Sequence, residues 1–264
     1  MTYVQRSISS LDLSNLVTCE DDSFVISDEQ RVSLATRFRS IPTTHRLRAD
    51  AWMVERRGNT GRQFAWSPVT ARRTIGNAAL RRGGEVSSLL SAIHDVVDEH
   101  LFRAAKGYAR HGTLGHWLAQ QTSPVLAIVT AEAMTWGTTA LETLESFGTP
   151  FSIAHSDAYY DVAGARTSLR GRRDALIATK NGRIVVRLRT GIPSPTAVAG
   201  LRADLTIDAF ANVEGCAAQR IVGVWPDAGI ALAVDGGESV IRAGARDLLR
   251  VAITQFRQHS SVAA

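Results

Sequence analysis

Residues 167–191 place one carboxylate and several arginines on two extended runs that the sequence predicts to form a β-hairpin. Asn181-Gly182 between the runs is the strongest short signal for a two-residue hairpin loop, and such a loop fixes the register. Asp174 should then face Arg189, with Arg187 on the same face, because side chains alternate between the two faces of a strand. Guanidinium groups bind phosphate through planar forks, whereas a carboxylate can hold a metal ion. The other face is the predicted core face, with Ala175, Ile177, Ile184, Val186 and Leu188.

Four short motifs around this hairpin resemble, in order, those of the RecB/Cas4-like branch of the PD-(D/E)XK nuclease superfamily. That branch typically has G-x-x-x-H on a helix, G-x-x-D at a strand, D/E-x-K followed by T-G on the next strand, and Q-x-x-x-Y on a later helix. Gly112–His116 matches the first motif, Gly171–Asp174 matches the second, and Arg187–Gly191 occupies the third position. Asp204 and Asp208 stand where glutamine and tyrosine are usual.

The resemblance covers about residues 107–212 and implies a restriction-endonuclease-like core, that is, a mixed sheet with β-hairpins flanked by helices. It also implies two carboxylates from neighbouring strands that hold Mg²⁺ or Mn²⁺, with a lysine that orients the attacking water. Here Arg187 replaces the second acid and Arg189 replaces the lysine. In a working site, the resemblance would assign metal binding and catalysis to Asp174 and His116.

The replacement of an acid by Arg187 reverses the charge at that position. Unit charges about 4 Å apart at a surface-like dielectric interact by roughly 4 kcal/mol, and a divalent ion doubles this value. The guanidinium group should therefore repel a metal ion by more than the one remaining carboxylate, Asp174, can restore. We expect no bound metal, no cofactor and no catalytic activity, with Asp174 paired to Arg189 instead.

A rebuilt metal site is the alternative. The second acid would then come from Asp157, Asp161 or Glu132, and the spacing of these residues singles out none of them. His116 could serve as a metal ligand beside Asp174, or it could be a partly buried histidine that binds a backbone group.

A second set of basic residues lies on a helix predicted over residues 68–82, which Ser67-Pro68 would begin. Its arginines would either contact DNA phosphates or form the solvated face of an amphipathic helix, and both interpretations stay open. The predicted nucleic-acid-binding set comprises Arg187, Arg189, Arg172, Arg72, Arg73, Arg81 and Arg82.

The composition suits a protein with a sizeable core. Of 264 residues, 45% are hydrophobic and 21% are charged, which excludes wholesale disorder. The net charge of +5 permits attraction to nucleic acid. Only two of the 30 basic residues are lysines, which suits phosphate recognition but is also what a high-GC genome produces.

The sequence predicts a cytoplasmic protein without membrane contact. It contains no apolar run of about 18 residues, and its N-terminus lacks the basic start and apolar stretch of a signal peptide. Cys19 and Cys216 lie far apart and suggest neither a disulfide framework nor a metal site.

We expect a flexible N-terminal arm at residues 1–26, followed by a single α/β domain over residues 27–264. Residues 27–148 are predicted to be mainly helical, and residues 149–264 to form the nuclease-like β-hairpin core. Four further elements have clear signals: a helix that begins at a Ser27–Gln30 capping box, a helix over 197–211, a hairpin over 219–235, and a last helix over 238–258.

The leading hypothesis is a catalytically inactive PD-(D/E)XK-type protein that binds nucleic acid, or serves as an accessory protein, in DNA repair, recombination or defence. One alternative is an active DNA nuclease with relocated ligands for Mg²⁺ or Mn²⁺. The other is a protein-interaction subunit that binds no nucleic acid and whose basic surface serves an acidic partner. Salt-sensitive DNA binding and metal-dependent cleavage distinguish the three hypotheses.

Overall fold

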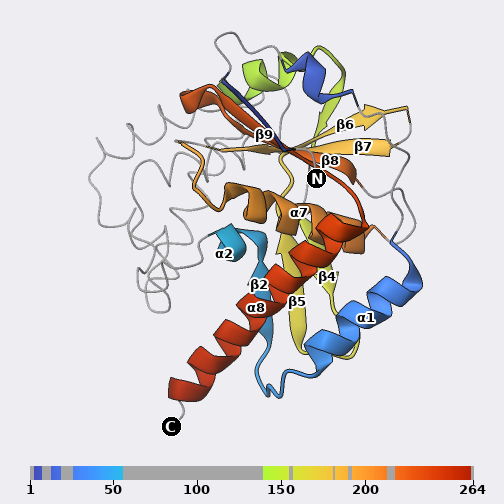
Figure 1. The fold of residues 1–264 in the computed structure, drawn as a ribbon, viewed down its shortest axis with the longest axis vertical. Coiled ribbons are helices and arrows are strands. Elements are labelled where there is room, and N and C mark those ends of the chain that lie inside the picture. Colours follow the sequence, from blue (N-terminus) through green and yellow to red (C-terminus); the bar gives the residue numbers. More distant parts are fainter. Residues whose placement is uncertain are drawn as a thin grey trace, which may run out of the picture.

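The fold is a mixed α/β arrangement of two mixed sheets flanked by helices (Figure 1). The computed structural model describes these residues: 3–7, 13–18, 26–55, 139–154, 157–180, 182–189, 192–212 and 218–262. The predicted helix over 68–82 with its arginines Arg72, Arg73, Arg81 and Arg82, and also His116 and Glu132, lie outside the described residues.

The large sheet has six strands in the order β1-β9-β8-β7-β6-β3. The neighbours β7 and β8 are parallel, and the other neighbouring pairs are antiparallel. The strands span Tyr3–Ser7 (β1), Phe151–Ile153 (β3), Ala175–Thr179 (β6), Gly182–Leu188 (β7), Ala218–Trp225 (β8) and Ile230–Asp235 (β9). Residues 3–7, which the sequence assigned to a flexible arm, thus form an edge strand paired with β9.

The predicted hairpin is confirmed as β6 and β7, but its predicted register is wrong by two residues. Its first run is also shorter than predicted, because residues 167–171 form a strand of a second sheet. Thr179 pairs with Gly182, so the strand begins at a glycine that the sequence assigned to the loop. Because the shift is even, each side chain keeps its face. Asp174, which directly precedes β6, therefore lies opposite Arg187 rather than Arg189.

Both faces of β7 are buried, whereas the sequence predicted one polar face. The helix α7 (Ala197–Ala211) covers the face that carries Val185, and helical residues 139–145 lie on the other side of the sheet (Figure 1). A strand with a parallel neighbour is joined to it by a crossover, and the crossover helix covers one face of the sheet. The charged side chains on that face must therefore find partners inside the protein.

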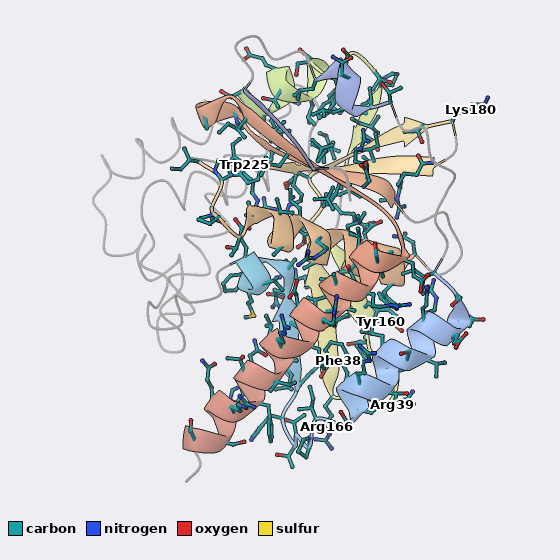
Figure 2. All side chains as sticks on the ribbon, viewed as in Figure 1. Phe38, Arg39, Tyr160, Arg166, Lys180 and Trp225 are labelled. Carbon is teal, nitrogen blue, oxygen red and sulfur yellow. The ribbon has the colours of Figure 1, made fainter. Side chains whose placement is uncertain are left out.

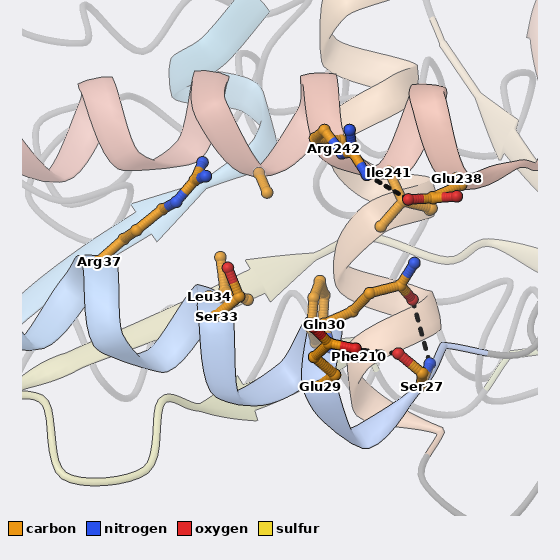
Figure 3. A pocket seen from close by; sticks show the side chains of 11 residues that line it. Ser27, Glu29, Gln30, Ser33, Leu34, Arg37, Phe210, Glu238, Ile241 and Arg242 are labelled. Carbon is orange, nitrogen blue, oxygen red and sulfur yellow. Dashed lines mark hydrogen bonds and ion pairs between the residues drawn. The ribbon is translucent and has the colours of Figure 1, made fainter.

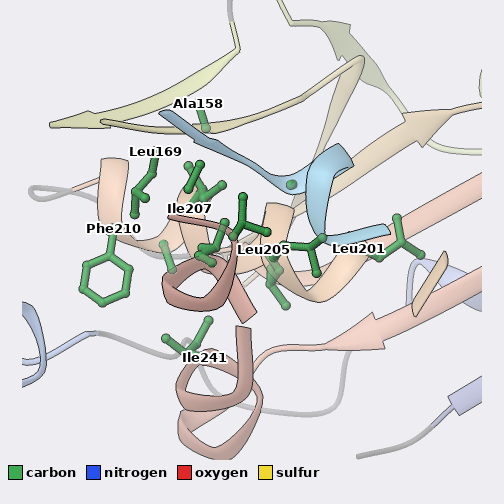
Figure 4. Packing of buried hydrophobic residues seen from close by; sticks show 14 of the residues in the cluster. Ala158, Leu169, Leu201, Leu205, Ile207, Phe210 and Ile241 are labelled. Atoms are coloured by element: carbon green, nitrogen blue, oxygen red, sulfur yellow. The ribbon is translucent and has the colours of Figure 1, made fainter. Parts of the chain in front are cut away.

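The small sheet has three strands in the order β2-β5-β4, with β2 (Leu47–Asp50) parallel and β4 (Ala158–Asp161) antiparallel to β5 (Thr167–Gly171). The helix α7 packs between the two sheets and is buried almost all round, which fits its mostly apolar sequence. Its residues Leu201, Leu205, Ile207 and Phe210 form the centre of the main core (Figure 4).

Three more helices surround this core: α1 (Asp28–Arg39), α2 (Ala51–Glu55) and α8 (Glu238–Val262). Figure 2 shows Phe38 of α1 and Tyr160 of β4 in the region between α1 and α8. It also shows Trp225, the last residue of β8. No described helix is both long enough and apolar enough to cross a membrane.

Several local predictions are confirmed. The Ser27 hydroxyl and the Gln30 side chain form the predicted reciprocal capping box of α1. The helix α7 has the predicted bounds, and the second hairpin closes at Gly229, whose φ of 60° favours glycine. The helix α8 is longer than predicted. The strand β2 and the short helix α2 were not predicted.

Candidate functional site

The motif positions of the nuclease resemblance converge between the large sheet and α7. Asp174 precedes β6, Arg187 lies on β7, and Asp204 lies on α7. Their side chains are almost completely buried, with 1%, 2% and 2% exposed. Three charged groups from separate elements thus share one interior space, which is the space where the resemblance predicts a metal site.

Arg187 joins the two aspartates. Its Nη1 forms an ion pair with Oδ2 of Asp204, and its Nε lies 3.6 Å from Oδ2 of Asp174. Asp174 also accepts a hydrogen bond of 3.0 Å from Nε of Arg172 and one of 2.9 Å from the backbone N–H of Leu188. Asp204 accepts a hydrogen bond of 2.8 Å from the backbone N–H of Arg172.

A second part of the network lies one helical turn further along α7. The carboxylate of Asp208, which is 1% exposed, accepts hydrogen bonds of 2.7 Å from Arg183 and 3.3 Å from Arg173. Positions four residues apart lie on the same helix face, so Asp204 and Asp208 both point toward the arginines around the hairpin. We call the set Arg172, Arg173, Asp174, Arg183, Arg187, Asp204 and Asp208 the buried network.

Arg189 has a different partner from the predicted one. Its guanidinium group pairs with the carboxylate of Glu55 at the end of α2 and lies 5.7 Å from the ring centre of Trp225. Glu55 also accepts a hydrogen bond of 3.1 Å from the hydroxyl of Ser194. The predicted pair between Asp174 and Arg189 is therefore replaced by two separate pairs.

The buried network is built to neutralise charge rather than to hold a cation. Arginine nitrogens lie against all three of its aspartates, where a divalent metal would need oxygen atoms facing an open space. Among the residues that the structure describes, no group of three or more metal-ligating side chains converges.

The same burial changes the prediction for nucleic-acid contacts. The side chains of Arg187 and Arg189 are 2% and 6% exposed, and that of Arg172 is 22% exposed. A phosphate oxygen cannot reach a guanidinium group that is covered and already bonded to a carboxylate. The described structure thus gives Arg187 and Arg189 a structural role, and any phosphate contact must come from arginines elsewhere.

The two upstream acids proposed as relocated ligands lie at the small sheet. The carboxylate of Asp157 pairs with Arg170 at 2.6 Å, and that of Asp161 pairs with Arg46 at 2.8 Å. Each of these carboxylates is thus already bound to an arginine.

The outer face of the small sheet gathers solvent-exposed arginines. Arg46, Arg48, Tyr159, Ser168 and Arg170 line a shallow depression of about 540 Å³. The side chains of the three arginines are 45% to 67% exposed. Asp161 raises the pKa of the Arg46 guanidinium group, first through the hydrogen bond it accepts and then through its charge. The shift favours the cationic form of Arg46.

A separate hollow of about 340 Å³ lies between α1 and α8 (Figure 3). Four of its polar groups are occupied locally: Ser27 and Gln30 bond each other, and Arg242 pairs with Glu238 one turn away. The hollow lies apart from the motif residues, and none of its lining residues was singled out by the sequence as a site residue.

Comparisons with protein-family models, with curated proteins and with solved structures found no match. Sequence reasoning had missed Glu55, Arg173 and Arg183 as members of the charged clusters. One signal could have identified Arg173 and Arg183: two aspartates four residues apart on a mostly apolar helix require cationic partners when that helix is buried. No comparable signal marks Glu55.

Proposed function

We propose that this protein is a catalytically inactive PD-(D/E)XK-type protein that binds nucleic acid in DNA metabolism. The proposal is supported by the order and position of the motif residues. The second motif ends at the start of β6, the third lies at the end of β7, and the last lies on the helix α7 that follows. Residues far apart in the sequence meet at one place, as motifs of a single site should.

A restriction-endonuclease-like core is part of this proposal. It is supported by the hairpin of β6 and β7, by the parallel neighbour β8, and by helices on both faces of the mixed sheet. The strand–strand–helix order around Asp174, Arg187 and Asp204 is the order that the resemblance implies.

The proposal that the protein is catalytically inactive rests on one observation, the position of the Arg187 guanidinium group between Asp174 and Asp204. A Mg²⁺ ion at that place would displace a buried cation from its carboxylates, and the arginine would remain nearby and repel it. Breaking a buried pair in this way costs about 3–5 kcal/mol, which metal binding would first have to offset.

A nucleic-acid-binding role is supported by charge. The chain carries a net charge of +5, and its exposed arginines include those of the small-sheet depression. Arginine is suited to phosphate because its guanidinium fork donates two parallel hydrogen bonds.

Two assays on the full chain test this proposal. Labelled single- and double-stranded DNA should remain intact with Mg²⁺ or Mn²⁺, and fluorescence anisotropy should show binding that weakens steeply as salt rises. Metal-dependent cleavage that Asp174→Asn abolishes would establish an active nuclease instead. Lack of any binding at low salt would remove the nucleic-acid role.

A further inference from the structure

The small sheet has one covered face and one open face. The helices α7 and α8 pack against its inner face, and this packing buries Leu47, Ala49 and Leu169. Alternation along the strands then directs six side chains to the other face: Arg48, Asp50, Ser168, Arg170, Tyr159 and Asp161. Asp50 and Ser168 are buried there, and the other four are exposed. We call this outward side, together with Arg46 at its end, the arginine face.

The charges on the arginine face are unequally exposed. Arg46, Arg48 and Arg170 are 67%, 49% and 45% exposed, while two of their aspartate partners, Asp50 and Asp157, are only 3% and 13% exposed. Among these acids only Asp161, at 61%, presents its charge freely to solvent. The face is therefore positive toward a ligand although each of its three arginines has an acidic partner.

Two further arginines extend this positive charge at one end of the small sheet. Arg39 donates a hydrogen bond to the carbonyl oxygen of Ala163, and Arg166 donates one to that of Thr44. Figure 2 shows Arg39 and Arg166 at the same end of the molecule. A carbonyl oxygen carries no net charge, so both guanidinium groups keep their full positive charge for an anion.

An aromatic ring stands beside these cations. Tyr159 is 49% exposed, and its hydroxyl is held between Asp161 at 2.9 Å and Arg46 at 2.8 Å. A ring fixed by hydrogen bonds loses little freedom when a flat group stacks on it. Arg48 and Tyr159 lie on the two outer strands, two strand spacings apart or about 9.5 Å.

We propose that the arginine face binds single-stranded DNA, with its arginines on the phosphates and Tyr159 stacked on a base. A flat, cationic surface with an exposed ring is the arrangement that single strands use, because only an unpaired base offers its face for stacking. This inference rests on the proposed nucleic-acid role and assigns that role to one surface and one kind of strand.

The test measures anisotropy of the full chain with a labelled oligothymidylate, at several salt concentrations. The double replacement Arg48→Ala with Arg170→Ala should weaken binding at least tenfold and reduce the salt slope by about 1.4, because each phosphate contact of a single strand contributes about 0.7. Arg242→Ala is the matched control, since Arg242 is also exposed and paired, but lies on α8. This control should bind like the unmodified chain.

A second pair of variants isolates stacking from charge. Tyr159→Leu should weaken binding about fivefold or more, whereas Tyr159→Phe keeps the ring and should retain most of the affinity. Circular dichroism of each variant confirms that it is folded, so loss of binding cannot be attributed to unfolding.

The possible failures are distinguishable. If the unmodified chain binds no nucleic acid, both the proposed function and this inference fail. If it binds, but the double arginine variant keeps its affinity and salt slope, only the arginine face is excluded. Tighter binding to a duplex or to an RNA of the same sequence would overturn the assignment to single-stranded DNA.

Discussion

The buried network and the arginine face are built from the same pair of residue types in opposite surroundings. Arg187 and Asp204 are each 2% exposed, whereas Arg46 and Asp161 are 67% and 61% exposed. Removal from water strengthens the attraction inside the protein, but it also makes each charge dependent on its partner. At the surface, water and ions screen the pair of Arg46 and Asp161 and leave both groups accessible to other ligands.

This difference in burial shows that an arginine in a motif position cannot be assigned a ligand from its residue type alone. Of the arginines that the sequence marked for DNA, the structure describes Arg172, Arg187 and Arg189, and these three lie largely inside, where they bind carboxylates. Those on the small sheet, which no motif marks, are exposed, so a phosphate can reach them. Exposure decides which arginine is structural and which can bind.

The largest expected effect is on the buried pair. Asp204→Asn keeps the size of the side chain and its hydrogen bond to Arg172, but leaves Arg187 as a buried cation. We expect a loss of about 3 kcal/mol in the free energy of unfolding. This value is at the lower end of the range for a broken buried ion pair, because Asp174 still lies 3.6 Å from Nε of Arg187. Urea unfolding measures it, and an unchanged midpoint would show that the interior tolerates the charge.

Removal of both charges should reverse much of that loss. The double replacement Arg187→Met with Asp204→Asn no longer leaves a cation without its partner, and Asp174 keeps Arg172 and the N–H of Leu188. We expect this variant to be more stable than Asp204→Asn alone by about 2 kcal/mol. Strictly additive effects in the urea experiment would mean that the two residues are not coupled.

An intermediate effect is expected at Asp50, where only one partner is buried. Its carboxylate is 3% exposed and accepts hydrogen bonds of 2.8 Å from Arg48 and from the indole of Trp52. Asp50→Asn removes one acceptor oxygen, but Arg48 remains solvated. We expect a loss of about 1–2 kcal/mol in unfolding free energy. A loss as large as that of Asp204→Asn would contradict the role given to partner burial.

The smallest effect is expected at Asp161. Asp161→Asn should leave the urea midpoint unchanged within error, at low and at high salt, because water replaces the carboxylate around Arg46. The same variant should bind single-stranded DNA more tightly, since it removes the one freely exposed acid of the arginine face. Weaker binding would show that Asp161 is needed to hold Arg46 and Tyr159 in place.

Two helices and both hairpins of the large sheet could be predicted because each is specified by residues close together in the sequence. The bounds of α7, the capping box of α1 and both hairpins follow from short patterns in the sequence. The register of the first hairpin does not. Gly182 lies in the strand, where the side chain of Gln219 packs against it, and an added Cβ would lie 3.0 Å from Cγ of Gln219. That contact comes from a distant strand.

The candidate site was predicted in part. The sequence identified the space around Asp174 and the charge reversal at Arg187, and the structure brings these two residues together with Asp204. The face of the hairpin that carries Asp174 and Arg187 was predicted to be a polar face rather than a core face. The alternation of side chains along a strand does not reveal that a helix covers that face. The small sheet was missed since its strands are short, and β2 pairs with residues more than a hundred positions away.

The central claim is that Arg187 occupies the space of a metal ion, and Mn²⁺ binding to the full chain tests it most directly. Titration of the unmodified protein, followed by the paramagnetic signal of the free ion, should show no binding that depends on Asp174. One Mn²⁺ bound per chain, and lost in Asp174→Asn, would contradict the claim.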